Sequence, residues 1–145
     1  MKFRAIAPTA VLALAVGLIP LAATPASAAA VTASGSCRAP DGGSEGSWTG
    51  TFSSLWMIRG ISLRVYDEKA DGHHVGIRLI TYDHRGVKKY WPWHKVYDGN
   101  GHGKIWNTSA QDDLQIFYAK VQVATIEGTT VLSSCETPAA TNPDL

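Results

Sequence analysis

The chain has 145 residues and carries 13 lysines and arginines against 12 aspartates and glutamates, a formal charge of +1. Without a basic excess it lacks the electrostatic signature of binding to nucleic acid or to an anionic membrane, so we expect neither partner. Hydrophobic residues make up 45% of the chain, enough for the core of one ordinary domain.

Residues 1–28 have the three parts of a secretory signal peptide. Lys2 and Arg4 give the positive start, residues 11–19 form an apolar run, and residues 26–28 (Ala-Ser-Ala) fit a signal peptidase site. The run is too short for a transmembrane helix, which needs ~20 residues. We therefore expect a secreted, extracellular protein without a membrane anchor. Removing these 28 residues from 145 leaves 117, and the loss of Lys2 and Arg4 moves the formal charge from +1 to −1.

The mature chain divides by composition into three parts. Residues 29–44 are rich in Ala, Ser, Gly and Pro and predict a flexible lead-in. Residues 45–136 carry the patterns of a β domain, and residues 137–145 predict a disordered tail. No window of ten or more residues shows a helical stripe.

Hydrophobic and polar residues alternate with period two in three segments, which indicates half-buried antiparallel strands. These segments are residues 61–66, 75–80 and 117–124, and further strands are expected at 48–52, 87–97, 103–107 and 130–135. The predicted fold is all-β: an antiparallel sandwich, or a small barrel, of about seven to eight short strands. Pro92 cannot donate a ladder hydrogen bond, so we expect the strand at 87–97 to lie at an edge or to contain a bulge.

Cys37 and Cys135 are the only cysteines, and both lie in the mature chain. In an oxidising compartment such a pair is normally bridged, and no Cys-x-x-Cys spacing suggests a redox or metal site. We predict one disulfide that ties the first strand region to the last. Closing so long a loop contributes up to ~4–5 kcal/mol in the chain-entropy model.

Three segments imitate catalytic or ligand-binding motifs, and each fails on context. Residues 67–72 resemble a calcium loop, but Lys69 and Arg78 stand where acidic ligands are needed. Residues 42–46 match Gly-x-Ser-x-Gly without the strand before and the helix after that the nucleophile elbow requires. Residues 99–104 are glycine-rich but lack the spacing of a phosphate loop. We predict no catalytic residue and no cofactor.

Histidines near predicted turns leave one enzymatic alternative open. A zinc site would use two or three of four histidines with Asp71 or Asp98, and these are His73, His74, His94 and His102. No His-x-His or His-x-x-x-His spacing supports that site, so we predict no metal. Solvated histidines are the simpler interpretation.

The segment Tyr90-Trp91-Pro92-Trp93-His94 is the best candidate for a binding surface. Two residues apart in a strand, Trp91 and Trp93 should project from the same face, where they could stack on sugar rings or anchor a protein. The alternative is that both belong to the core. We also expect Trp48, Trp56 and Trp106 to be buried.

Several stretches resemble small secreted proteins of actinomycetes: the Ala-Ser-Ala end of the signal, residues 63–67, 70–75 and 90–94, and the closing Ser133-Ser134-Cys135. The resemblance covers most of the mature chain and implies an extracellular location and a β fold, but no activity. Small secreted hydrolase inhibitors of the same bacteria share this general build, although their binding-loop motifs are not found here.

These observations together predict a secreted, monomeric, non-catalytic binding protein for an extracellular glycan or protein, with inhibition of a hydrolase as one form of that role. A metal-assisted hydrolase and a structural protein of the cell surface or spore coat are the alternatives. The predicted binding residues are Tyr90, Trp91, Trp93 and His94, together with His73, His74 and His102 in adjoining turns.

Overall fold

The structure is a computed structural model that describes residues 30–145, so the predicted signal peptide lies outside the described residues. Every regular element in this range is a β-strand. The ten strands are β1 (Val31–Arg38), β2 (Ser44–Ser54), β3 (Met57–Asp67), β4 (His74–Tyr82), β5 (Lys88–Tyr90), β6 (His94–Val96), β7 (Gly103–Gln111), β8 (Tyr118–Glu127), β9 (Thr130–Glu136) and β10 (Ala140–Thr141). Within residues 30–145 no helix is long and apolar enough to cross a membrane.

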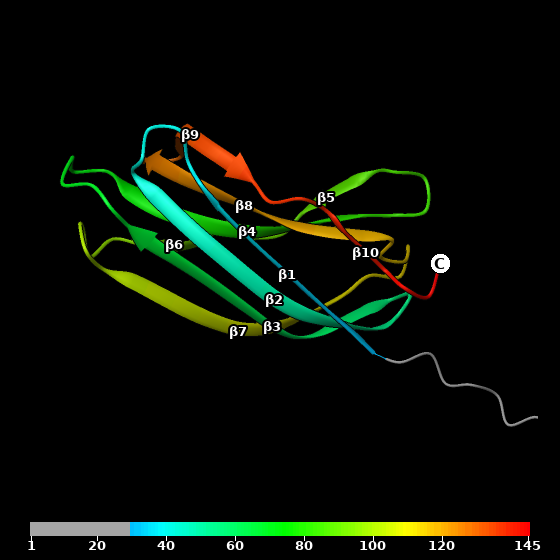
Figure 1. The fold of residues 1–145 in the computed structure, drawn as a ribbon. Helices are drawn as coiled ribbons and strands as arrows, with labels where there is room; N and C mark the ends of the chain where they lie inside the picture. The colour runs from blue at the N-terminus through cyan, green and yellow to red at the C-terminus, as the bar shows by residue number, and fades with distance from the viewer. Residues whose placement is uncertain (1–29) are drawn as a thin grey trace, which may run out of the picture.

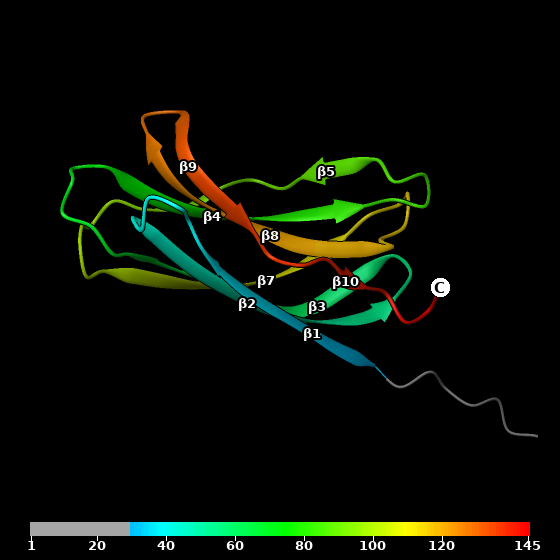
Figure 2. The ribbon, with the colours of Figure 1, turned by 45° about the horizontal axis from the view of Figure 1, so that its top comes forward.

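The strands form two antiparallel sheets that pack face to face (Figures 1 and 2). Sheet A has the order β1-β2-β3-β7. Sheet B has the order β10-β8-β4-β5, with β6 also paired to β4 and β9 also paired to β8. The chain is therefore an antiparallel β-sandwich, as the alternating pattern predicts.

The core lies between the sheets and is made of the inward residues of both. Trp48 and Leu63 from sheet A meet Ile77, Val121 and Val123 from sheet B, and each is at most 1% exposed. Burying one such side chain stabilises the fold by roughly 1.5–3 kcal/mol. Trp56, expected to be buried, is instead 47% exposed, because it falls in the tight turn between β2 and β3.

Half of the expected flexible lead-in forms a strand instead, because residues 31–38 make up β1. This strand pairs with β2 along its whole length, from Val31 opposite Phe52 to Arg38 opposite Glu45. Its small residues allow close packing: a Cβ on Gly35 would lie 3.0 Å from Cβ of Thr137. The small residues of this segment suggested flexibility, but the fold requires them because larger side chains would not fit.

The expected disordered tail is wrong for a related reason, since residues 137–145 are tied to the rest of the fold. β10 pairs with β8, and the side chain of Asn142 is 1% exposed. Its Nδ2 donates to the carbonyl oxygens of Ser54 at 3.1 Å and Ile116 at 2.8 Å. A buried polar anchor of this kind depends on distant backbone groups and leaves no local pattern in the sequence.

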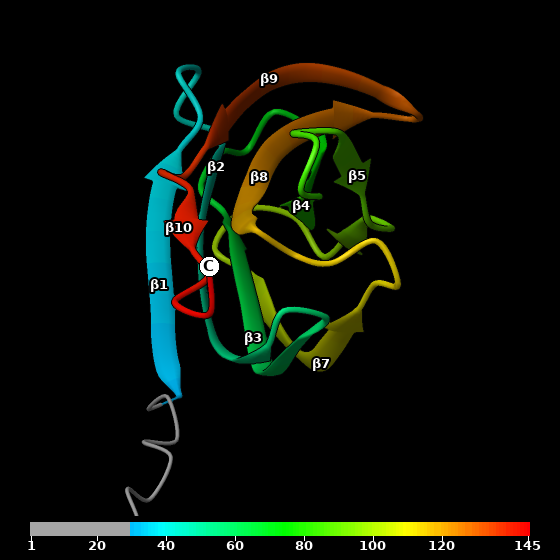
Figure 3. The same ribbon diagram turned by 90° about the vertical axis from the view of Figure 1, so that its right-hand side faces the viewer.

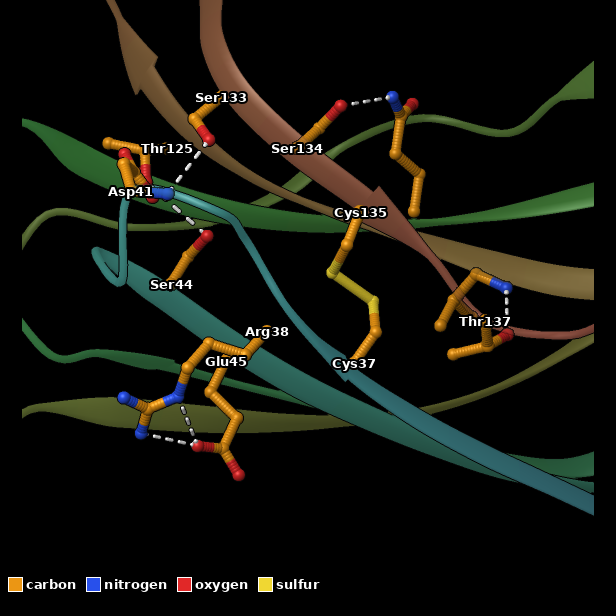
Figure 4. The surroundings of a disulfide bond; sticks show 12 residues. Cys37, Arg38, Asp41, Ser44, Glu45, Thr125, Ser133, Ser134, Cys135 and Thr137 are labelled. Carbon is orange, nitrogen blue, oxygen red and sulfur yellow. Dashed lines mark hydrogen bonds and ion pairs between the residues drawn. A yellow bond between two sulfur atoms is a disulfide. The ribbon is translucent and has the colours of Figure 1, made fainter.

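The predicted disulfide between Cys37 and Cys135 is present, with 6.1 Å between the Cα atoms (Figure 4). It joins β1 of sheet A to β9 of sheet B. Nearby, the hydroxyl of Thr125 donates to that of Ser44 at 3.3 Å, a second link between the sheets. One side of the sandwich is thus closed, whereas β5 and β7 lie at the opposite side (Figure 3).

Candidate functional site

A β-bulge interrupts the edge of sheet B at the Trp91-Pro92-Trp93 segment. Tyr90 of β5 pairs with Ile80, and His94 of β6 pairs with Ile77. Two residues of β4 therefore face three residues of the edge, and the extra one is the mark of a bulge. This confirms the prediction made from Pro92, whose missing N–H removes the ladder bond at this point.

Because the bulge inserts one residue, Trp91 and Trp93 lie on opposite faces of sheet B, and the prediction of a shared face is wrong. Trp91 points inward: its Nε1 donates to the hydroxyl of Thr81 at 3.1 Å, and it packs against the core. Trp93 lies on the outer face, where its ring covers Gly76 and contacts Arg78. Each tryptophan thus has a different neighbourhood and a different role.

The outer face of sheet B holds a guanidinium group framed by aromatic rings. The Cζ of Arg78 lies 4.2 Å from the ring centroid of Tyr90 and 4.4 Å from that of Trp93. Its Nε donates to Oε1 of Gln122 at 2.8 Å. We call Arg78, Tyr90, Trp93 and Gln122 the Arg78 clamp. Burial lowers the pKa of Arg78.

Strand register explains why the clamp forms. Alternate residues of β4 face outward, and Arg78 pairs with Gln122 of β8, whose side chain has the same orientation. Tyr90, opposite Ile80, lies on the same face and is 48% exposed. Sequence reasoning found Tyr90 and Trp93 but missed Arg78 and Gln122, since only the pairing of β4 with β8 brings them together.

More aromatic and basic side chains continue this face beyond the clamp. The rings of Tyr82 and Tyr118 meet edge to face with centroids 6.3 Å apart. The ammonium groups of Lys88 and Lys120 lie 5.7 and 5.3 Å from the ring centroid of Tyr82. Lys120 also pairs with Glu136. The outer face of sheet B is therefore a surface of rings and cations.

A small cleft opens on the inner side of the bulge, between the edges of the two sheets. Its volume is about 260 Å³. The lining residues come from β3, β4, β7 and the bulged edge, and they are Leu63, Leu79, Trp91, Pro92, His94, Thr108 and Ser109. The His94 ring lies 5.1 Å from that of Trp106, and burial lowers the pKa of His94. Two predicted binding residues, Trp91 and His94, thus belong to this cleft and not to the clamp.

The remaining histidines lie apart from both features. His73 contacts Glu127 through Nδ1 at 2.5 Å, and the ring of His74 stacks on Tyr97 with centroids 4.6 Å apart. The Nδ1 of His102 lies 3.2 Å from the backbone oxygen of Asn100. Among residues 30–145, no group of three or more His, Cys, Asp or Glu side chains converges as a metal site would require. The predicted binding residues are therefore not brought together in one site.

No protein-family model, no curated protein and no solved structure matches this chain. A function for the protein must therefore come from the geometry of its own side chains. Of the places described above, the Arg78 clamp combines partial exposure, fixed geometry and charge.

Proposed function

We propose that this is a secreted, non-catalytic, monomeric protein that recognises another extracellular protein through the outer face of sheet B. The observation that carries the proposal is the Arg78 clamp. Tyr, Trp and Arg are the residue types enriched at the centres of protein interfaces, where a few of them supply most of the binding energy. Here one of each lies together on a partly exposed sheet face.

Secretion rests on two observations of different kinds. The signal peptide pattern in residues 1–28 predicts export. The disulfide between Cys37 and Cys135 is typical of an oxidising compartment. Together they support a partner that is itself extracellular.

A protein partner fits the clamp better than a glycan does. Stacking on a sugar ring needs a free aromatic face, but Trp93 has Arg78 over its ring and lies against Gly76. Tyr82 has the ammonium groups of Lys88 and Lys120 near its ring. Because cations already cover the faces of these aromatic rings, a partner would contact the ring edges and the charged groups, as it does in a protein interface.

The rigidity of the clamp also favours binding. Its residues project from β4, β5 and β8 and from the bulge, not from a long loop. Side chains that are already ordered lose less entropy when a partner binds, so more of the contact energy appears as affinity.

Affinity capture with matched variants tests the proposal. The mature protein is immobilised and exposed separately to extracellular proteins and to polysaccharides of the same source. We expect a protein to be retained by the wild type and by Trp56→Ala, whose exposed ring lies in the turn between β2 and β3, but lost with Tyr90→Ala combined with Trp93→Ala. Retention of a polysaccharide alone, or of a protein that ignores the double substitution, would contradict it.

A further inference from the structure

Arg78 makes no direct ion pair with the described residues, although the negative charge of Glu136 lies near enough to favour its charged form. None of the ion pairs in residues 30–145 includes it, and the nearby Glu136 is engaged by Lys120 at 2.5 Å. Within residues 30–145, the one hydrogen bond that its side chain makes uses Nε. The two Nη atoms have no acceptor in the described chain, yet they keep contact with solvent.

This arrangement costs stability in the free protein. A half-buried cation loses hydration, and the two rings and one amide oxygen compensate only in part. An arginine held without a carboxylate, and with its donors open to solvent, is suited to an anion that arrives with a ligand.

The hydrogen bonds around Gln122 fix which side of the guanidinium remains available. The Nε2 of Gln122 donates to the hydroxyl of Ser134 at 3.2 Å, so Oε1 is turned toward Arg78. Since Oε1 accepts from Nε, the pair of Nη atoms forms the free end. Two parallel N–H donors match the two oxygens of a carboxylate.

We propose that Arg78 binds a carboxylate of the protein partner, an Asp or Glu side chain, end-on through its two Nη atoms. Tyr90 and Trp93 contact the apolar atoms beside that carboxylate and shield the pair from water. The inference rests on the proposed function and names the chemistry that the partner must present. The ammonium group of Lys88 on the same face, which is in no ion pair among residues 30–145, favours an acidic surface around it.

An NMR titration with two small probes tests this site without knowledge of the partner. The probes are the α-amides of N-acetyl-glutamic acid and of N-acetyl-glutamine, which have similar shape and differ in charge. At neutral pH we expect the glutamate probe to shift the Nε–H signal of Arg78 and the indole N–H signal of Trp93 in a saturable way. The glutamine probe should leave both signals in place.

Three variants separate a carboxylate site from general attraction to positive charge. Arg78→Lys keeps the charge but loses the paired donors, so affinity for the glutamate probe should fall about tenfold. Gln122→Glu gives Arg78 an internal carboxylate and should weaken the probe to a similar degree while the fold is retained. Arg64→Lys is the control, since Arg64 lies 6.0 Å from the ring of Tyr66 on sheet A.

Shifts that are absent or equal for both probes would overturn the inference. It would also be overturned if the affinity for the glutamate probe, followed at the indole N–H of Trp93, were unchanged in Arg78→Lys and Gln122→Glu. Shifts of equal size with inorganic phosphate would also overturn it, because they would show an anion site without preference for carboxylate. The proposed function fails differently, through capture that ignores the Tyr90 and Trp93 substitutions. If capture depends on those rings but the titration shows no shift, the protein binds a partner through this face and the carboxylate inference is wrong.

Discussion

The Nε of Arg78 donates a 2.8 Å hydrogen bond to Oε1 of Gln122, its direct neighbour across the pairing of β4 with β8. Gln122 in turn donates to Ser134 of β9. The side chain of a surface arginine is usually mobile. That of Arg78 is instead held by hydrogen bonds that link three strands. The orientation of the proposed binding group is built into the sheet.

Gln122→Ala should therefore weaken both stability and recognition. Loss of the two hydrogen bonds made by the Gln122 side chain is expected to lower the free energy of unfolding by roughly 1–2 kcal/mol. Chemical denaturation measures this change, with Gln111→Ala at the exposed end of β7 as the control. If Gln122→Ala unfolds like the wild type and the control, the hydrogen bonds that link Ser134, Gln122 and Arg78 do not hold the clamp in place.

The two tryptophans of the bulge should respond in opposite ways. Trp91→Ala removes a ring that packs against the core and should destabilise the fold by about 3 kcal/mol, near the lower end for large buried rings. Trp93→Ala should lower the free energy of unfolding less than Trp91→Ala does, and should weaken partner binding more. Unfolding curves and capture assays on both variants test this contrast. Equal destabilisation with equal loss of binding would place both rings in one environment and contradict the bulge.

Removal of the disulfide should lower the free energy of unfolding. The bond joins residues 98 positions apart, so it restricts a long loop of the unfolded chain. The protein with Cys37→Ser and Cys135→Ser should lose about 2–5 kcal/mol of unfolding free energy. Denaturation of this variant beside the oxidised protein measures the loss. A stability unchanged within about 0.5 kcal/mol would mean that hydrogen bonds and packing alone hold β1 to β9.

Asp83 should make stability fall in strong acid. Although partial burial opposes its ionisation, hydrogen bonds from Arg85 and from the backbone of Val87 lower its pKa from 3.8 to about 2. A folded-state pKa below the unfolded value gives stability that is present above pH 3.8 and is lost as the pH falls toward 2. The free energy of unfolding of the wild type and of Asp83→Asn, measured against pH, should converge over this range. A constant difference would show that the carboxylate charge contributes nothing.

Local patterns in the sequence predicted much of this fold. Alternation placed strands over the segments that became β3, β4 and β8, and Pro92 indicated the irregular edge. Cys37 and Cys135 were paired correctly, because only one pairing exists. These features depend on residues close in the chain or on simple counting.

What the sequence could not predict depends on contacts between distant residues. Trp91 and Trp93 have the spacing of one face, and only the register on β4 reveals the extra residue between them. Arg78 and Gln122 become neighbours through a pairing of strands 44 residues apart. The small residues of β1 suggested flexibility, since the close packing of Gly35 against Thr137 is not visible locally.

The affinity of a captured extracellular protein for the wild type, and for Tyr90→Ala combined with Trp93→Ala, tests the central claim most directly. If the outer face of sheet B is the binding surface, the folded double variant should bind at least about thirtyfold more weakly, the loss expected for interface centres. Trp56→Ala should match the wild type. Unchanged affinity in a correctly folded double variant would contradict the claim that this face binds the partner.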